Sequence, residues 1–87
     1  MPPDTYSAMT VRSDTVVMSY IDTSNFENPN IRYEVRVYSK AGLKIVNTKE
    51  TNLIVKGVSK TRCRIEVRSL LDGRHSNPLK FGCNETG

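Results

Sequence analysis

The two cysteines, Cys63 and Cys83, carry the clearest chemistry in this chain. An even number of cysteines in a small domain permits a disulfide bond. Both cysteines lie in segments of alternating apolar and polar residues, Arg62–Leu70 and Pro78–Cys83, and the Asp-Gly pair at 72–73 between them is a strong hairpin signal. Centring the turn on the glycine of this pair places the cysteines opposite each other, so we predict a disulfide bond between them.

The same register pairs the other residues of the two strands by type. Inward apolar residues meet inward apolar residues, and an acid meets a base on the outer face, whereas a slip of one residue would mix the faces. The pairs are Ile65 with Phe81, Val67 with Leu79, and Glu66 with Lys80. We expect a non-hydrogen-bonded cysteine pair with Cα atoms about 4.5 Å apart, within disulfide range. The alternative is two buried free thiols in a reducing compartment.

The titratable residues do not form a catalytic or metal-binding set. The single histidine, His75, follows Arg74 in a turn, and the only acid nearby in sequence is Asp72. A general base needs a partner that orients it, and zinc needs about four Cys or His ligands. We therefore expect a protein that is not an enzyme and that uses no metal or cofactor, with His75 as a solvated loop residue.

The elements that would position these residues are short strands. Apolar residues recur with a period of two along most of the chain, and no stretch has a helical period. We expect seven strands: Tyr6–Val11, Thr15–Ile21, Ile31–Tyr38, Leu43–Val46, a strand from Leu53 that ends near Gly57, Arg62–Leu70 and Pro78–Cys83. Seven short alternating strands in one small domain predict an all-β fold, a seven-stranded two-sheet antiparallel sandwich.

Length and composition limit the organisation of the chain. Its 87 residues are enough for one domain, which we place at 5–83, with residues 1–4 as a linker and 84–87 as a tail. No apolar run approaches the ~20 residues that span a bilayer, so this segment itself is not expected to contact a membrane. No apolar leader follows residues 1–4, which favours a piece of a larger protein.

Several short motifs resemble the fibronectin type III domain in order along nearly the whole chain. They are Met18-Ser19-Tyr20, Tyr33-Glu34-Val35, Val55-Lys56-Gly57-Val58, Cys63-Arg64-Ile65-Glu66-Val67 and Ser76-Asn77-Pro78. Pro2-Pro3 resembles the proline-rich segment that leads into the first strand of the family. Two positions depart from the family pattern: Tyr20 stands where the family has a buried Trp, and Cys63 stands at the tyrosine-corner position. A disulfide between the last two strands is similar to that of the membrane-proximal domains of class II cytokine receptors and tissue factor.

The resemblance implies an extracellular or secreted, non-catalytic module of a receptor or cell-adhesion protein. Such a module binds a protein ligand or positions neighbouring domains. The alternative is a structural spacer or self-assembly domain of a surface protein, without a ligand of its own. Asn84-Glu85-Thr86 matches the N-glycosylation pattern, which is consistent with a secreted glycoprotein.

Two surfaces have the composition of a binding site. Connections 22–30 and 70–75 meet at one end of such a sandwich and hold the candidate partner-binding residues Phe26, Leu70, Leu71 and Arg74. The outer sheet face holds the basic residues Arg32, Arg36, Arg64, Arg68 and Lys80, interrupted by Glu34 and Glu66. We interpret this face as a cross-strand charge ladder; the alternative is a docking surface for an acidic protein or a sulfated glycan.

Nucleic acid is not an expected partner. Binding to single strands uses aromatic side chains interleaved with the cations. The outer face offers only Tyr38.

Overall fold

The computed structural model describes residues 2–87, and all regular structure among them is β-strand. The strands begin and end close to the positions that alternation predicts. They are β1 (Thr5–Val11), β2 (Thr15–Ile21), β3 (Arg32–Ser39), β4 (Gly42–Thr48), β5 (Asn52–Lys56), β6 (Arg64–Leu71), β7 (Arg74–His75) and β8 (Leu79–Gly82). β8 is the seventh expected strand, and β7 is an additional two-residue strand that the sequence did not predict. Both pair with β6, and Pro78 lies in the segment between them.

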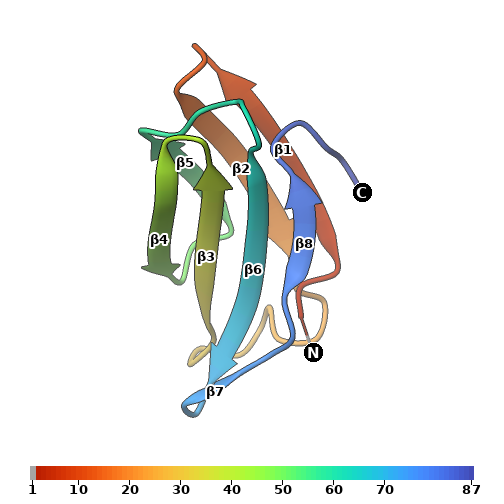
Figure 1. The fold of residues 1–87 in the computed structure, drawn as a ribbon. Helices are drawn as coiled ribbons and strands as arrows, with labels where there is room; N and C mark the ends of the chain where they lie inside the picture. Colours follow the sequence, from red (N-terminus) through yellow and green to blue (C-terminus); the bar gives the residue numbers. More distant parts are fainter. Residues whose placement is uncertain (1) are drawn as a thin grey trace.

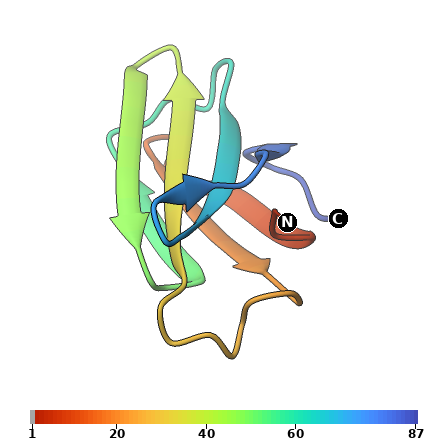
Figure 2. The same ribbon diagram turned by 90° about the horizontal axis from the view of Figure 1, so that it is seen from below.

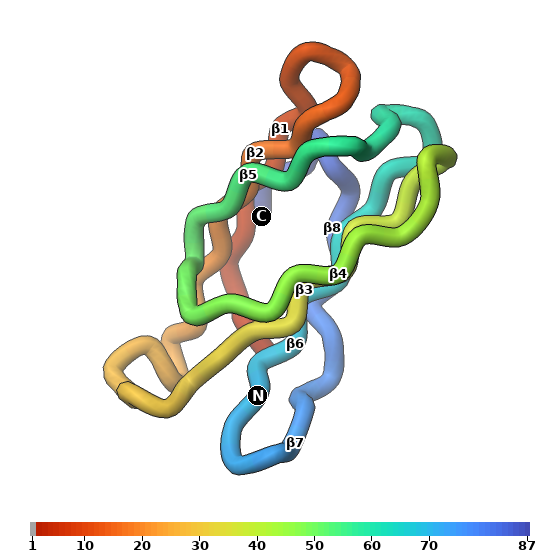
Figure 3. The backbone as a smooth tube through the Cα atoms, turned by 90° about the vertical axis from the view of Figure 1, so that its left-hand side faces the viewer, coloured from red at the N-terminus to blue at the C-terminus, as the bar shows by residue number. Residues whose placement is uncertain are grey.

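The strands form two antiparallel sheets that pack face to face as a sandwich (Figures 1 and 2). One sheet has the order β1-β2-β5, and the other has the order β4-β3-β6, with β7 and β8 on the far side of β6. The tube in Figure 3 shows the two layers edge-on, with β1, β2 and β5 in one layer. The structure therefore confirms the predicted all-β two-sheet sandwich.

The core fills the space between the sheets with every second residue of the strands. Alternation places these side chains inward because successive residues of a strand point to opposite faces. At the centre lie Tyr20, Tyr33, Val35, Ile65 and Phe81, each 4% exposed or less. The Tyr20 and Tyr33 rings meet edge to face at 5.1 Å, so aromatic residues from the two sheets pack against each other at the centre of the core.

The predicted hairpin register and the disulfide bond are both present. Ile65 pairs with Phe81 in an antiparallel ladder, and Cys63 and Cys83 are bonded with their Cα atoms 5.4 Å apart. The expectation of a non-hydrogen-bonded pair is wrong, because the Cys83 N–H donates to the Cys63 carbonyl oxygen at 3.3 Å. The longer Cα distance is that of a hydrogen-bonded pair.

The connections gather at opposite ends of the sandwich (Figure 1). We call residues 22–31, 49–51 and 72–78 the loop end, and residues 12–14, 40–41 and 57–63 the turn end. At the loop end, Asp72 and Gly73 have φ of 52° and 77°. These values suit the tight hairpin turn that an Asp-Gly pair predicts.

Residues 3–4 and 84–87 lie against the sandwich. Pro3 is buried, and the Asp4 N–H donates to the Ile21 carbonyl at 3.0 Å. Past Cys83 the chain crosses to the other sheet, where the Ala8 N–H donates to the Glu85 carbonyl at 2.9 Å. Asp4, in the segment expected as a linker, and residues 84–87, expected as a tail, thus make backbone hydrogen bonds to β2 and β1.

Candidate functional site

The loop that follows β2 is organised by a buried carboxylate. Asp22 is 1% exposed and accepts hydrogen bonds from the Ser24 N–H at 3.3 Å, the Asn25 side-chain amide at 3.2 Å and the Tyr33 hydroxyl at 3.2 Å. Burial, followed by the negative charge of Asp22, raises the pKa of Tyr33 to about 12. Because core residue Tyr33 holds Asp22, the first turn of the loop is fixed to the sheet.

Successive turns then carry the loop outward. The Asn28 N–H donates to the Asn25 carbonyl at 2.9 Å, and the Ile31 N–H donates to the Asn28 carbonyl at 3.2 Å. Phe26 lies within these turns and is 68% exposed. A phenylalanine folded back over the rim of the core would be covered, so the exposure of Phe26 shows that its side chain is instead presented to solvent.

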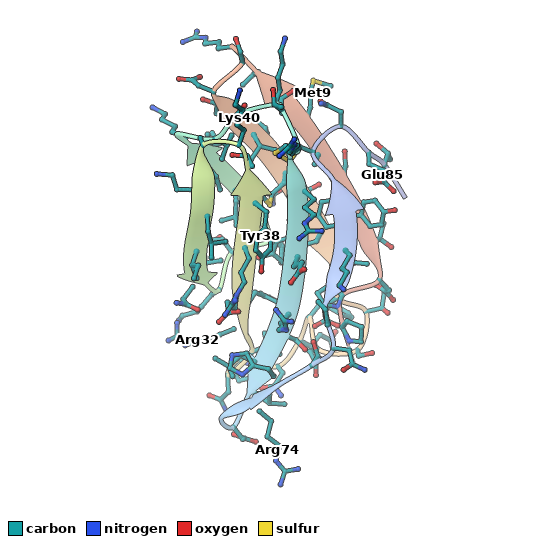
Figure 4. All side chains as sticks on the ribbon, viewed as in Figure 1. Met9, Arg32, Tyr38, Lys40, Arg74 and Glu85 are labelled. Carbon is teal, nitrogen blue, oxygen red and sulfur yellow. A yellow bond between two sulfur atoms is a disulfide. The ribbon has the colours of Figure 1, made fainter. Side chains whose placement is uncertain are left out.

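Of the four candidate partner-binding residues, Phe26 and Arg74 are exposed, and Leu70 and Leu71 are half-buried. Arg74 is exposed on β7, and Figure 4 shows it reaching away from the sandwich. Leu71 is half-buried and packs against the core, so it belongs in part to the fold. Leu70 is half-buried on the outer sheet face, where its cross-strand neighbours are Arg32 and His75.

The two connections do meet. A groove at the loop end is lined by Asn25 from the first connection and by Ser69, Leu71, Asp72, Arg74, His75 and Ser76 from the second. Its lining is mostly polar, and Phe26 projects from the same loop as Asn25. Phe26 and Arg74 are both exposed at this end of the sandwich, and aromatic and arginine side chains are enriched in protein interfaces.

The outer face of the sheet formed by β4, β3, β6, β7 and β8 is a ladder of paired charges. Glu34 lies 2.7 Å from Arg36, 3.9 Å from Arg68 and 3.7 Å from His75, and Glu66 lies 3.4 Å from Arg68. The hydrogen bond to Glu34 raises the pKa of the Arg36 guanidinium further. The acid nearest His75 is therefore Glu34, brought in from β3, and not Asp72 as the sequence order suggested.

A third surface was missed by the sequence reasoning. Met9, Val17 and Ile54 form a row across the outer face of the β1-β2-β5 sheet, because Met9 pairs with Val17 and Val17 pairs with Ile54. They are 63%, 41% and 67% exposed. The available signal was the presence of apolar residues at consecutive positions, Val16 to Met18 and Leu53 to Val55, where strict alternation would place polar residues.

Asn84 of the glycosylation pattern is exposed, and its side-chain oxygen is engaged. Its Oδ1 accepts from the Thr10 N–H at 2.9 Å and from the Thr10 hydroxyl at 3.0 Å. The next residue, Glu85, accepts from the Gly82 N–H and the Tyr6 hydroxyl, and these hydrogen bonds lower the pKa of its carboxyl.

Two further properties of residues 2–87 concern metals and membranes. No group of three or more His, Cys, Asp or Glu side chains within them is arranged to hold a metal ion. No helix among them could cross a membrane. A scan against protein-family models and a search of the curated proteins each found no match.

Proposed function

We propose that this chain is an extracellular, non-catalytic protein-binding module of a receptor or adhesion protein, and that it belongs to the fibronectin type III class. The strand division supports that class. The fourth strand, β4, pairs with β3 and not with the sheet of β1 and β2, and this distinguishes the chain from a constant-type immunoglobulin sandwich. The Cys63–Cys83 disulfide supports an oxidising compartment.

The observation that carries the proposal is the exposure of Phe26. A phenylalanine that is 68% exposed, on a loop that a buried carboxylate already fixes, contributes little to the core. Burying such a side chain against a partner contributes about 1.5–3 kcal/mol. Arg74, on the neighbouring connection, adds a fork of charge-assisted hydrogen bonds to a carboxylate of the partner.

The experiment is a binding screen with a matched variant. An array of secreted and cell-surface ectodomains is probed with the wild-type domain and with the double variant Phe26→Ala, Arg74→Ala. We expect at least one ectodomain that binds the wild type and binds the double variant about 30-fold more weakly, which corresponds to ~2 kcal/mol. The unfolding temperature of the double variant should stay close to that of the wild type, since both side chains are exposed.

The control variant is Arg36→Ala, Arg64→Ala, which changes the charged sheet face and leaves the loop end intact. Partners that lose affinity with this control, and keep it with the loop-end variant, would move the interface to the sheet. Equal loss of affinity and stability in the loop-end variant would show that Phe26 and Arg74 belong to the fold.

A second candidate, self-assembly, is favoured by the apolar row Met9, Val17 and Ile54. The outer face of that sheet carries no carboxylate, and its one charged side chain is Lys56 at the end of β5. Two copies can therefore place these faces together with little repulsion between like charges at the contact, although each chain carries a net charge of +4. Sedimentation velocity over a concentration series distinguishes the two: a dimer that Ile54→Lys abolishes supports self-assembly, and a monomer at all concentrations excludes it.

A further inference from the structure

Basic residues gather at the turn end, opposite to the loop end. Seven of the 13 Lys and Arg side chains lie on or beside its turns, and the only acid on those turns is Asp14. All seven are exposed: Arg12, Lys40, Lys44, Lys56, Lys60, Arg62 and Arg64. Figure 4 places Lys40 at this end and Arg74 at the other. The net charge of +4 is therefore concentrated at one pole of the molecule.

These cations differ from Arg36 and Arg68 at the centre of the sheet face because they have no acidic partners in the described part of the chain, a property they share with Arg32 and Lys80. Arg36 and Arg68 are paired with glutamates within 4.0 Å. In residues 2–87, none of the seven turn-end cations has a carboxylate within that distance. Their positive field is consequently uncompensated and extends into solvent, where it attracts anions.

The turns that hold the cations are fixed to one another. The Lys40 N–H donates to the Thr61 carbonyl at 3.0 Å, and the Ser59 N–H donates to the Ser39 hydroxyl at 3.0 Å, so the β3–β4 and β5–β6 connections are hydrogen-bonded together. The disulfide begins at Cys63, directly after Arg62. A platform of this kind loses little conformational entropy when a ligand binds.

Several of these cations line one groove. Arg62 lies in the turn between β5 and β6, with φ of 55°. The Arg64 guanidinium is held 5.0 Å from the centre of the Tyr38 ring. Together with Ser39, Lys60 and Cys63, these residues line one groove beside the turns.

We infer that the turn end is a binding site for a sulfated glycan chain. Closely spaced cations with Asp14 as the only acid on their turns suit the regularly spaced sulfate and carboxylate groups of such a polymer, which releases counterions when cations neutralise it. Three of the residues that line the groove are the cations Lys60, Arg62 and Arg64, which favours an anionic polymer as the ligand. Tyr38 is already covered by Arg64, so no free aromatic platform remains for the bases of a nucleic acid.

The experiment measures binding of the intact domain to immobilised heparin and to chemically desulfated heparin. We expect binding to heparin that weakens steeply with salt, and little binding to the desulfated chain. The variant Lys40→Gln, Lys60→Gln, Arg62→Gln should weaken heparin binding by about tenfold or more at moderate salt. All three side chains are exposed, so an unchanged unfolding temperature checks that the variant is folded.

The matched control, Arg32→Gln, Lys49→Gln, Lys80→Gln, removes the same amount of charge away from the turn end. This control should keep most of the affinity. An equal loss in both variants would show attraction to net charge alone and would overturn the site. Equal binding to desulfated heparin, or stronger binding to single-stranded DNA or to phosphatidylserine vesicles, would also overturn it, by assigning the turn end to another ligand.

Discussion

Cys63 and Cys83 are bonded directly across the β6–β8 hairpin, each lying one residue outside the paired strands. A link at this position closes the open end of the last hairpin. At this end β6 begins after Cys63, and the chain after Cys83 crosses to β1. In a chain of 87 residues the hydrophobic core is small, and a covalent link contributes a large part of the stability that such a domain has.

Removal of the disulfide should therefore destabilise the domain strongly. For Cys63→Ser, Cys83→Ser we expect a loss of about 3 kcal/mol in the free energy of unfolding, because the unfolded chain regains the entropy of an open loop of 20 residues. Urea unfolding measures this loss. Two alkylatable thiols in the native wild-type protein, detected by intact mass, would contradict the bond itself.

Truncation of a core side chain of β3 should lower the free energy of unfolding more than truncation of a side chain on the outer face of β2. Val35 is fully buried between Val46 and Val67, and Val35→Ala should lower stability by roughly 1–3 kcal/mol through lost burial and a cavity. The same change at Val17, which is 41% exposed, should cost less than ~0.5 kcal/mol. Similar losses in the two variants would mean that the assigned faces are incorrect.

The hydrogen bond from Tyr33 to Asp22 should hold the binding loop in place. Tyr33→Phe removes the hydroxyl that donates a hydrogen bond to Asp22 from inside the core. The free energy of unfolding should fall by about 1–3 kcal/mol, because a buried carboxylate loses a hydrogen-bond donor. Tyr20→Phe is the matched control: its hydroxyl donates to the carbonyl oxygen of exposed Glu50, which water can reach. A smaller loss for Tyr33→Phe than for Tyr20→Phe would be inconsistent with this role.

Stability should fall in alkaline solution as Tyr33 ionises. The pKa of Tyr33 is about 12 in the folded protein against an ordinary value of 10.0. The folded state therefore holds this proton more tightly, and its contribution is complete below pH 10 and is lost as the pH rises to about 12. Unfolding free energies measured across this window should decrease less for Tyr33→Phe than for the wild type; identical slopes would exclude Tyr33 as the cause.

The fold could be predicted from the sequence because the alternation of apolar residues and the residues of the turns indicate the same strand pairing. The inward set of Ile65, Val67 and Phe81 fits only one hairpin register, and the Asp-Gly turn supplies the positive φ values that this register needs. The short strand β7 was not predicted, since a strand of two residues leaves no periodic signal.

The surfaces were less predictable, because they depend on residues that only the fold brings together. The pairing of His75 with Glu34 joins residues far apart in sequence. The burial of Asp22 could not be inferred from a polar loop sequence, and the turn-end cations come from separate connections. Leu71 looked available for a partner, yet it packs on the core because β6 extends one residue further than alternation indicated.

Hydrogen–deuterium exchange with a bound partner tests the central claim, that the loop end is the protein-binding surface. The domain is measured alone and saturated with an ectodomain that the array identifies. We predict that protection on binding is concentrated in residues 23–29 and 70–75, where Phe26 and Arg74 are exposed. Protection confined to the charged face of β3, β6 and β8, or to the β1-β2-β5 sheet, with none in the two connections, would contradict the account.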